Sequence, residues 1–182
     1  MQICLIRHAH AVEGEDDAAR PLSKRGREQI RMMGRFLRET GALTAREFWH
    51  SPLVRARDTA VLLAKRLKVR AKLIQVAGLL YSDNPAVMAK RLGKIRRPVA
   101  MVGHEPHLSA LASLLAAGSA KPPLFDLKKC AVVALERTRG RWAVVWQVSP
   151  EVIKRRSGTP QPRLTTQPHR EPACQLRESP PY

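Results

Sequence analysis

The stretch Leu5-Ile6-Arg7-His8-Ala9-His10-Ala11 closes an apolar run that begins at residue 2. A short continuous apolar run of this kind predicts a strand covered on both faces, as in the parallel sheet of an α/β protein. Ligands of such sheets bind outside the carboxyl ends of the strands. We therefore expect Arg7 and His8 to lie where a substrate can reach them.

The pair of side chains formed by Arg7 and His8 suits a phosphoryl group. An imidazole is a good nucleophile, and a guanidinium complements phosphate oxygens in a bidentate fork. The alternative is a strand end that passes into solvated polar residues. The pair alone does not decide between these interpretations.

Two later segments also place polar residues between a strand and a helix. After the run at 47–50, Ser51-Pro52-Leu53-Val54-Arg55 predicts a helix start, with proline suited to the first helical position. After an apolar strand at 98–102, Gly103-His104-Glu105-Pro106 leads into another helix. Two helix amino ends at one crevice would offer free N–H groups and positive dipole ends to an anion.

Together these segments resemble the histidine phosphatase (phosphoglycerate mutase-like) superfamily, and the short chain resembles its SixA-type phosphohistidine phosphatases. The resemblance covers roughly residues 1–150 and rests on Arg7-His8, Ser51-Pro52-x-x-Arg55-Ala56-x-x-Thr59-Ala60, Gly103-His104-Glu105-Pro106 and Arg20-Pro21-Leu22-Ser23-x-x-Gly26. It implies that His8 is the nucleophile that becomes phosphorylated. It also implies that Arg7, Arg55 and His104 hold the phosphoryl oxygens, with Arg20 and Glu105 as candidates for substrate binding.

The chain departs from the superfamily pattern at three positions. Ala9 stands in place of the usual glycine, and Asp58 in place of the more usual glutamine. Gly78 falls at about the position where related enzymes carry a glutamate general acid. Asp83 could substitute, but an aspartate ahead of Asn84-Pro85 is more often a turn former. The general acid is left unassigned.

The remaining patterns predict a three-layer α/β sandwich, with helices on both faces of a mostly parallel mixed sheet. Helices are expected from Ser23 to about Thr40, at 54–67 with Val61, Leu62 and Leu63 inward, at 86–92 and at 107–117. Strands are expected at 72–76 and 98–102, and a hairpin around Arg139-Gly140.

Residues 151–182 differ in character from the domain at 1–150. They contain six prolines and no sustained periodicity, which predicts a basic, largely disordered tail. The six Lys or Arg and three acids of the tail give it a net charge of +3, so +15 of the formal +18 belongs to the domain.

The expected setting is cytoplasmic. No apolar run approaches the roughly 20 residues that span a bilayer, and the amino end does not follow the signal-peptide pattern. Three widely spaced cysteines indicate reduced thiols. We expect a monomer without cofactor or metal that acts on a phosphorylated protein of the histidine phosphotransfer type. A small phosphate ester or nucleotide is the alternative substrate.

The high positive charge also permits a module that binds nucleic acid or another polyanion. The sequence shows no recognition helix or RNA-binding aromatic motif. Many of the charges fall on the outward side of the first helix, at positions such as Lys24 and Arg31. A solvated basic face is therefore the preferred interpretation.

A metal site is a further alternative. The candidate ligands are His8, His10, His104 and His107, with Asp58 or Glu105 nearby. Arg7 and Arg55 argue against it, because fixed cations in the same pocket repel a divalent metal. His10 and His107 are interpreted instead as rim or helix-surface residues.

Overall fold

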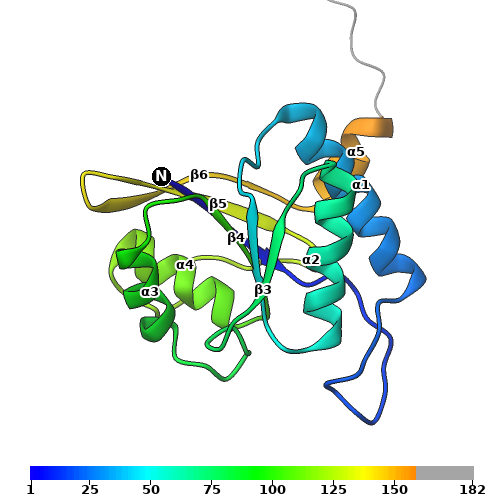
Figure 1. The fold of residues 1–182 in the computed structure, drawn as a ribbon, viewed down its shortest axis with the longest axis horizontal. Coiled ribbons are helices and arrows are strands. Elements are labelled where there is room, and N and C mark those ends of the chain that lie inside the picture. Colours follow the sequence, from blue (N-terminus) through cyan, green and yellow to red (C-terminus); the bar gives the residue numbers. More distant parts are fainter. Residues whose placement is uncertain (159–182) are drawn as a thin grey trace, which may run out of the picture.

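A single mixed sheet of six strands runs through the part of the chain described by the computed structural model, residues 1–158 (Figure 1). The strands are β1 (Gln2–Arg7), β2 (Glu47–His50), β3 (Lys72–Gln75), β4 (Val99–Gly103), β5 (Val132–Thr138) and β6 (Arg141–Val148). The helices are α1 (Lys24–Thr40), α2 (Val54–Leu67), α3 (Pro85–Lys94), α4 (His107–Ala117) and α5 (Pro150–Gly158).

The sheet has the strand order β3-β2-β4-β1-β5-β6. The first four strands in this order are parallel, whereas β5 and β6 are antiparallel to their neighbours. The register pairs Arg7 with Gly103 and His50 with Val102. The residues that follow β1, β2 and β4 therefore emerge side by side at one edge of the sheet.

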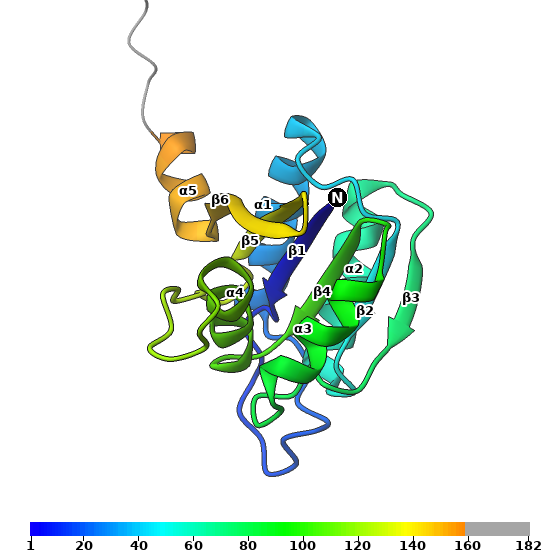
Figure 2. The same cartoon turned by 90° about the vertical axis from the view of Figure 1, so that its left-hand side faces the viewer.

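The buried side chains of β1 alternate between two apolar cores. Cys4 and Ile6 pack into the core that α1 and α2 cover, and Ile3 and Leu5 pack into the core that α3 and α4 cover. Figures 1 and 2 show these helix pairs on opposite faces of the sheet. The predicted α/β sandwich with a mostly parallel mixed sheet is confirmed.

The first helix begins and ends where the sequence predicts. The Ser23 hydroxyl accepts a hydrogen bond from the Gly26 N–H at 3.1 Å, and Gly41 ends the helix with φ 62°. Gly26 also permits a close approach, because a Cβ there would lie 2.0 Å from the His10 carbonyl oxygen. The start of α1 is thus pressed against the loop that follows the His8 strand.

The second helix spans the predicted residues 54–67 but differs from the prediction on its inner face. The proline of Ser51-Pro52 lies just ahead of the helix, and the Val54 N–H donates to the Ala18 carbonyl. Val61 is 39% exposed, while Leu63 is fully buried. Three successive residues of a helix point in different directions, so the prediction that Val61 faces inward is wrong.

Helix α5 crosses the predicted end of the domain at residue 150. It packs against α1, and Ile153 contacts the core between α1 and the sheet. The predicted tail beyond residue 158 lies outside the described residues. No helix of residues 1–158 is long and apolar enough to cross a membrane.

Candidate active site

The candidate site forms where the loops after β1, β2 and β4 meet. These loops contribute His8, Ser51 and His104, and the first turn of α2 adds Arg55. The His8 N–H donates to the Gly103 carbonyl at 3.0 Å, which ties two of the loops together. The imidazole rings of His8 and His104 lie 4.9 Å apart, centroid to centroid.

His8 is held as a neutral base with one unprotonated ring nitrogen. Its Nδ1–H donates to the Ala9 carbonyl at 2.7 Å, which leaves the lone pair of Nε2 directed into the site. Burial, with the charges of Lys129, His104 and Arg55, lowers the pKa of His8 from 6.5 to about 2. The ring therefore stays unprotonated at physiological pH.

His104 is also buried and neutral, and Ser51 fixes its orientation. The Ser51 hydroxyl lies 2.6 Å from Nε2 of His104. Burial first, and then the charges of Arg55 and Lys129, lower the pKa of His104 from 6.5 to about 4. Within residues 1–158, Nδ1 of His104 has no hydrogen-bond partner. That nitrogen is available to a group that enters the site.

Two arginines, Arg7 and Arg55, lie near the histidines, and each arginine donates to a backbone carbonyl. Arg7 donates from Nη1 to the Leu127 carbonyl at 2.7 Å. Arg55 is 4% exposed and donates to the Asp17 carbonyl and, at 3.0 Å, to the Asp17 carboxylate. The Arg55 hydrogen bond is the main cause that lowers the pKa of Asp17. In the free protein, the main-chain carbonyl and the carboxylate of Asp17 thus each accept from one terminal nitrogen of Arg55.

Arg20 also contacts Asp17, and each of its three guanidinium nitrogens already donates to a protein group. It donates to the Val12 carbonyl at 2.8 Å and to the carboxylates of Asp17 and Glu13, each at 3.0 Å. Arg20 therefore braces the loop that carries Asp17. A contact between Arg20 and substrate stays a prediction.

Of the two remaining acidic candidates, Glu105 is half-buried at the start of α4. Burial raises its pKa, and one carboxylate oxygen is buried with no partner in the described chain. Its predicted role in substrate binding stays a prediction. Asp83 accepts a hydrogen bond from the Leu80 N–H at 2.7 Å, as a turn former does. The general acid is still unassigned.

Lys129, which lies just ahead of β5, is a residue of the site that was not predicted from the sequence. Its Nζ is 3.2 Å from Nε2 of His8. Burial, followed by the charges of Arg7, Arg55 and Arg20, lowers the pKa of Lys129 from 10.5 to about 8. Lys129 belongs to no recognisable motif and lies 121 residues from its partner. No pattern in the sequence could have singled it out.

The other predicted histidines lie apart from any ligand set. Nδ1 of His10 lies 2.9 Å from the Ser23 hydroxyl. His107 is 2% exposed, so its predicted place on a helix surface is wrong; the helix turns it toward α3 and the core. Among residues 1–158, no group of three or more His, Cys, Asp or Glu side chains is placed to hold a metal ion.

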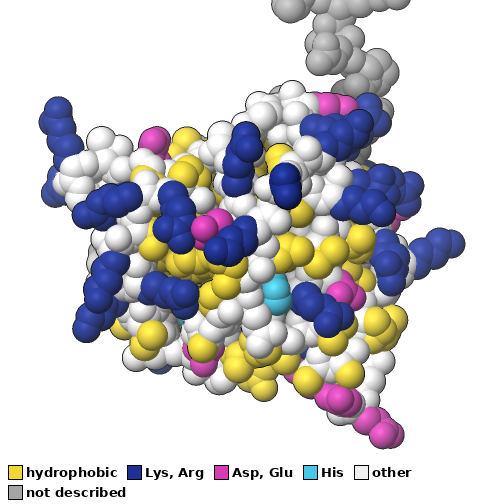
Figure 3. Space-filling view, in the orientation of Figure 1, with side chains coloured by type: hydrophobic (Ala, Val, Ile, Leu, Met, Phe, Trp, Pro, Cys, Tyr) yellow, Lys and Arg dark blue, Asp and Glu magenta, His cyan; other side chains and the backbone are white. Residues whose placement is uncertain are grey.

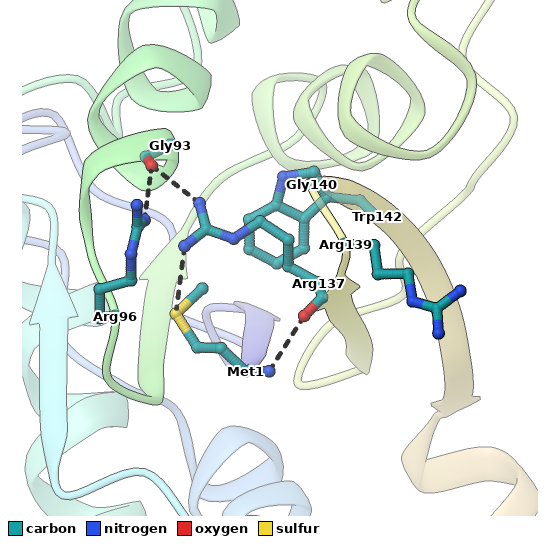
Figure 4. A pocket seen from close by; sticks show the side chains of 7 residues that line it. All are labelled: Met1, Gly93, Arg96, Arg137, Arg139, Gly140 and Trp142. Atoms are coloured by element: carbon teal, nitrogen blue, oxygen red, sulfur yellow. Dashed lines mark hydrogen bonds between the residues drawn. The ribbon is translucent and has the colours of Figure 1, made fainter.

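A cavity of about 490 Å³ lies at the opposite edge of the sheet, where β1 begins and β5 ends (Figure 4). Its central cation, Arg137, donates to the carbonyls of Gly93 and Ile95 and lies over the Trp142 ring at 5.3 Å. Because carbonyls already occupy these donors, Arg137 joins structural elements and does not offer an anion site.

The basic side chains do not gather into one surface on the face that Figure 3 shows. Lysines and arginines are spread there between apolar and neutral areas. Several are paired, as in the ion pairs Arg35–Glu39 and Arg97–Glu47. On this face the charge fits a solvated surface better than a continuous nucleic-acid track.

Comparison with known proteins gives a family match for the first half of the domain. Residues 3–79 match the model of the histidine phosphatase superfamily, branch 1. This segment includes Arg7, His8 and Arg55, and ends before His104 and Lys129. No curated protein sequence matches the chain.

Solved structures share the whole fold. The protein histidine phosphatase SixA complexed with tungstate superposes with a TM-score of 0.75 and 23% identity, over 84% of this chain and 99% of that chain. The putative phosphohistidine phosphatase SixA from Agrobacterium tumefaciens gives 0.68 and 17%, over 82% and 97% of the two chains. A putative alpha-ribazole-5'-P phosphatase from Escherichia coli gives 0.69 and 18%, over 82% and 98%. The histidine phosphatase model thus matches residues 3–79, and the fold of the chain is that of these superposed phosphatase structures.

Proposed function

We propose that the protein is a phosphohistidine phosphatase in which His8 is the nucleophile. The observation that carries this proposal is the unprotonated Nε2 of a buried, neutral His8 between Arg7, Arg55 and His104. A neutral imidazole keeps its lone pair for attack, and the neighbouring cations complement the phosphoryl oxygens. The family match and the SixA neighbours support the same assignment.

The proposed reaction has two steps. In the first, the substrate's phosphorylated imidazole takes a proton from solvent on its other ring nitrogen, Nε2 of His8 attacks phosphorus, and the bond from phosphorus to the substrate's nitrogen breaks, so that the substrate ring departs as neutral imidazole. Arg7 and Arg55 neutralise the charge on the equatorial oxygens, and His104 donates to one of them from Nδ1 while Ser51 holds Nε2. In the second, water attacks the phosphohistidine, which releases phosphate and restores neutral His8.

The nature of the leaving group favours a phosphorus–nitrogen bond. An alkoxide departs with difficulty unless a positioned acid protonates it, an effect worth roughly a hundredfold or more. Asp83, the nearest candidate acid, is occupied in a turn. An imidazole, whose pKa is about 6.5, leaves with little help. Small phosphate esters or nucleotides are the second candidate substrates, since one superposed structure is a putative alpha-ribazole-5'-P phosphatase.

A trapping experiment tests the nucleophile. Labelled phosphoramidate should leave an acid-labile, base-stable phosphoryl group on the wild-type protein and on His10→Asn, and none on His8→Asn. Asparagine keeps a donor for the Ala9 carbonyl but has no nucleophilic nitrogen. Equal labelling of His8→Asn would refute the proposal.

A substrate panel tests the bond that is cleaved. A phosphorylated histidine phosphotransfer domain should give a higher kcat/KM than an aryl phosphate, and the aryl phosphate a higher kcat/KM than 3-phosphoglycerate. Equal kcat/KM for the phosphoprotein and the alkyl ester would favour the second candidate function.

A further inference from the structure

The main chain fixes Lys129 against the end of the His8 strand. The next residue, Cys130, is buried with φ 63°, a left-handed conformation that costs a non-glycine residue energy. The Cys130 N–H donates to the carbonyls of Arg7 and His8 at 3.1 and 3.3 Å. These backbone hydrogen bonds of Cys130 therefore hold the main chain of Lys129 beside His8.

The ammonium group of Lys129 occupies the place of an incoming phosphoryl group. A phosphorus atom poised for attack would lie about 3–3.5 Å from Nε2 of His8. Nζ now lies at 3.2 Å from that nitrogen. A substrate must therefore displace the ammonium. During attack, the leaving-group atom of the substrate lies on the far side of phosphorus from Nε2, in line with it. The equatorial oxygens are thus the nearest acceptors for the displaced Nζ.

The surroundings of Lys129 repel its charge when the site is empty. No carboxylate of residues 1–158 forms an ion pair with Nζ. The groups that act on it are His8 and Arg7 from the β1 end, Arg55 from α2, and Arg20 and Glu13 from the loop before α1. Of these, Glu13 attracts the ammonium and Nε2 of neutral His8 accepts a hydrogen bond from it, whereas the three arginines repel it. A half-buried cation among cations is costly, and an anionic ligand would offset that cost.

We propose that Lys129 is a further phosphoryl ligand, which covers Nε2 of His8 in the free enzyme and moves to an equatorial oxygen when substrate binds. The catalytic part of this role rests on the proposed function of His8. The anion-binding part does not, because inorganic phosphate would meet the same cations.

The test compares Lys129→Met and Lys129→Arg with Lys128→Met. Lys128 is the adjacent exposed lysine, paired with Asp126, and provides a matched control. Methionine keeps the length of the side chain without its charge. Two quantities are measured: kcat/KM for an aryl phosphate across pH 6–10, and the affinity for inorganic phosphate by calorimetry.

Lys129→Met should lower kcat/KM roughly a hundredfold, as the loss of one oxyanion donor does. It should weaken phosphate binding and should not lower Tm, because it removes an unpaired cation. Lys128→Met should behave as wild type. The wild-type kcat/KM should fall as pH rises through about 8, where Lys129 loses its proton. Lys129→Arg should retain activity without that fall, since a guanidinium stays charged.

The proposal is overturned if kcat/KM and phosphate affinity of Lys129→Met both stay within about threefold of wild type. An effect of that size is what the loss of an ordinary surface charge produces. Failure of the proposed function gives a different pattern. In that case the wild type neither turns over phosphate substrates nor forms a phosphoenzyme, and the phosphate affinities alone decide for or against Lys129. A wild type that does not bind phosphate overturns both.

Discussion

Acidification should destabilise the protein through protonation of His8. In the unfolded chain His8 has its ordinary pKa of 6.5, and in the folded protein burial lowers this pKa to about 2. The unfolded state therefore binds more protons below pH 6.5, so this contribution to stability is complete above pH 6.5 and is lost as pH falls toward 2. At about pH 5 the loss amounts to 1.5 pH units at 1.36 kcal/mol each, about 2 kcal/mol.

Urea unfolding of wild type and His8→Asn at about pH 7.5 and pH 5 measures this contribution. Asparagine can donate to the Ala9 carbonyl as Nδ1 of His8 does, and it does not titrate. The free energy of unfolding of the wild type should fall by about 2 kcal/mol more than that of the variant. His104, with a pKa of about 4, adds a loss in both proteins and cancels in the comparison.

Equal losses in the two proteins, within about 0.5 kcal/mol, would show that His8 is not held neutral by the fold. The position of Nε2 in the site would then no longer imply that His8 is unprotonated, and able to attack phosphorus, at physiological pH. A wild type that loses less stability than the variant would reverse the sign of the argument and refute it.

Three further variants test the packing around the site and the role of Asp17. Gly26→Ala should destabilise the protein by about 3 kcal/mol in urea unfolding, because its Cβ would meet the His10 carbonyl at 2.0 Å. Gly93→Ala, with open space in α3, should instead stabilise it by about 0.5–1 kcal/mol. Asp17→Asn should tighten inorganic phosphate binding about two- to fivefold in calorimetry, since it removes an exposed carboxylate from Arg55. Weaker binding by this variant would contradict the view that Asp17 competes with phosphate.

The sequence was informative wherever a local pattern determines a local structure. The apolar run before Arg7 gave a central strand, and Ser23 and Gly41 marked the ends of α1. The Arg139-Gly140 turn joins β5 and β6, and both residues have positive φ, as tight hairpins favour. Each of these features depends on neighbours within a few residues.

The parts that escaped prediction depend on distant segments meeting in space. Lys129 reaches His8 only because β5 pairs antiparallel with β1. Asp17 reaches Arg55 across 38 residues from a loop without a periodic pattern. Periodicity also misled at Val61, because consecutive apolar residues in a helix cannot share one face.

Asp17 and Lys129, the two residues that the sequence did not reveal, lie in the free site where a bound phosphoryl group is expected. The Asp17 carboxylate accepts from Nη2 of Arg55, a predicted ligand of phosphoryl oxygens, and Nζ of Lys129 lies at the distance from Nε2 that phosphorus would take. Substrate binding is then an exchange: the phosphoryl group displaces one anion from Arg55 and one cation from His8. Displacing Asp17 weakens the binding of substrate and product alike, because its carboxylate already neutralises part of the charge of Arg55 in the free site. We therefore expect inorganic phosphate to leave the hydrolysed site readily, with Asp17 and Lys129 returning to the positions seen here.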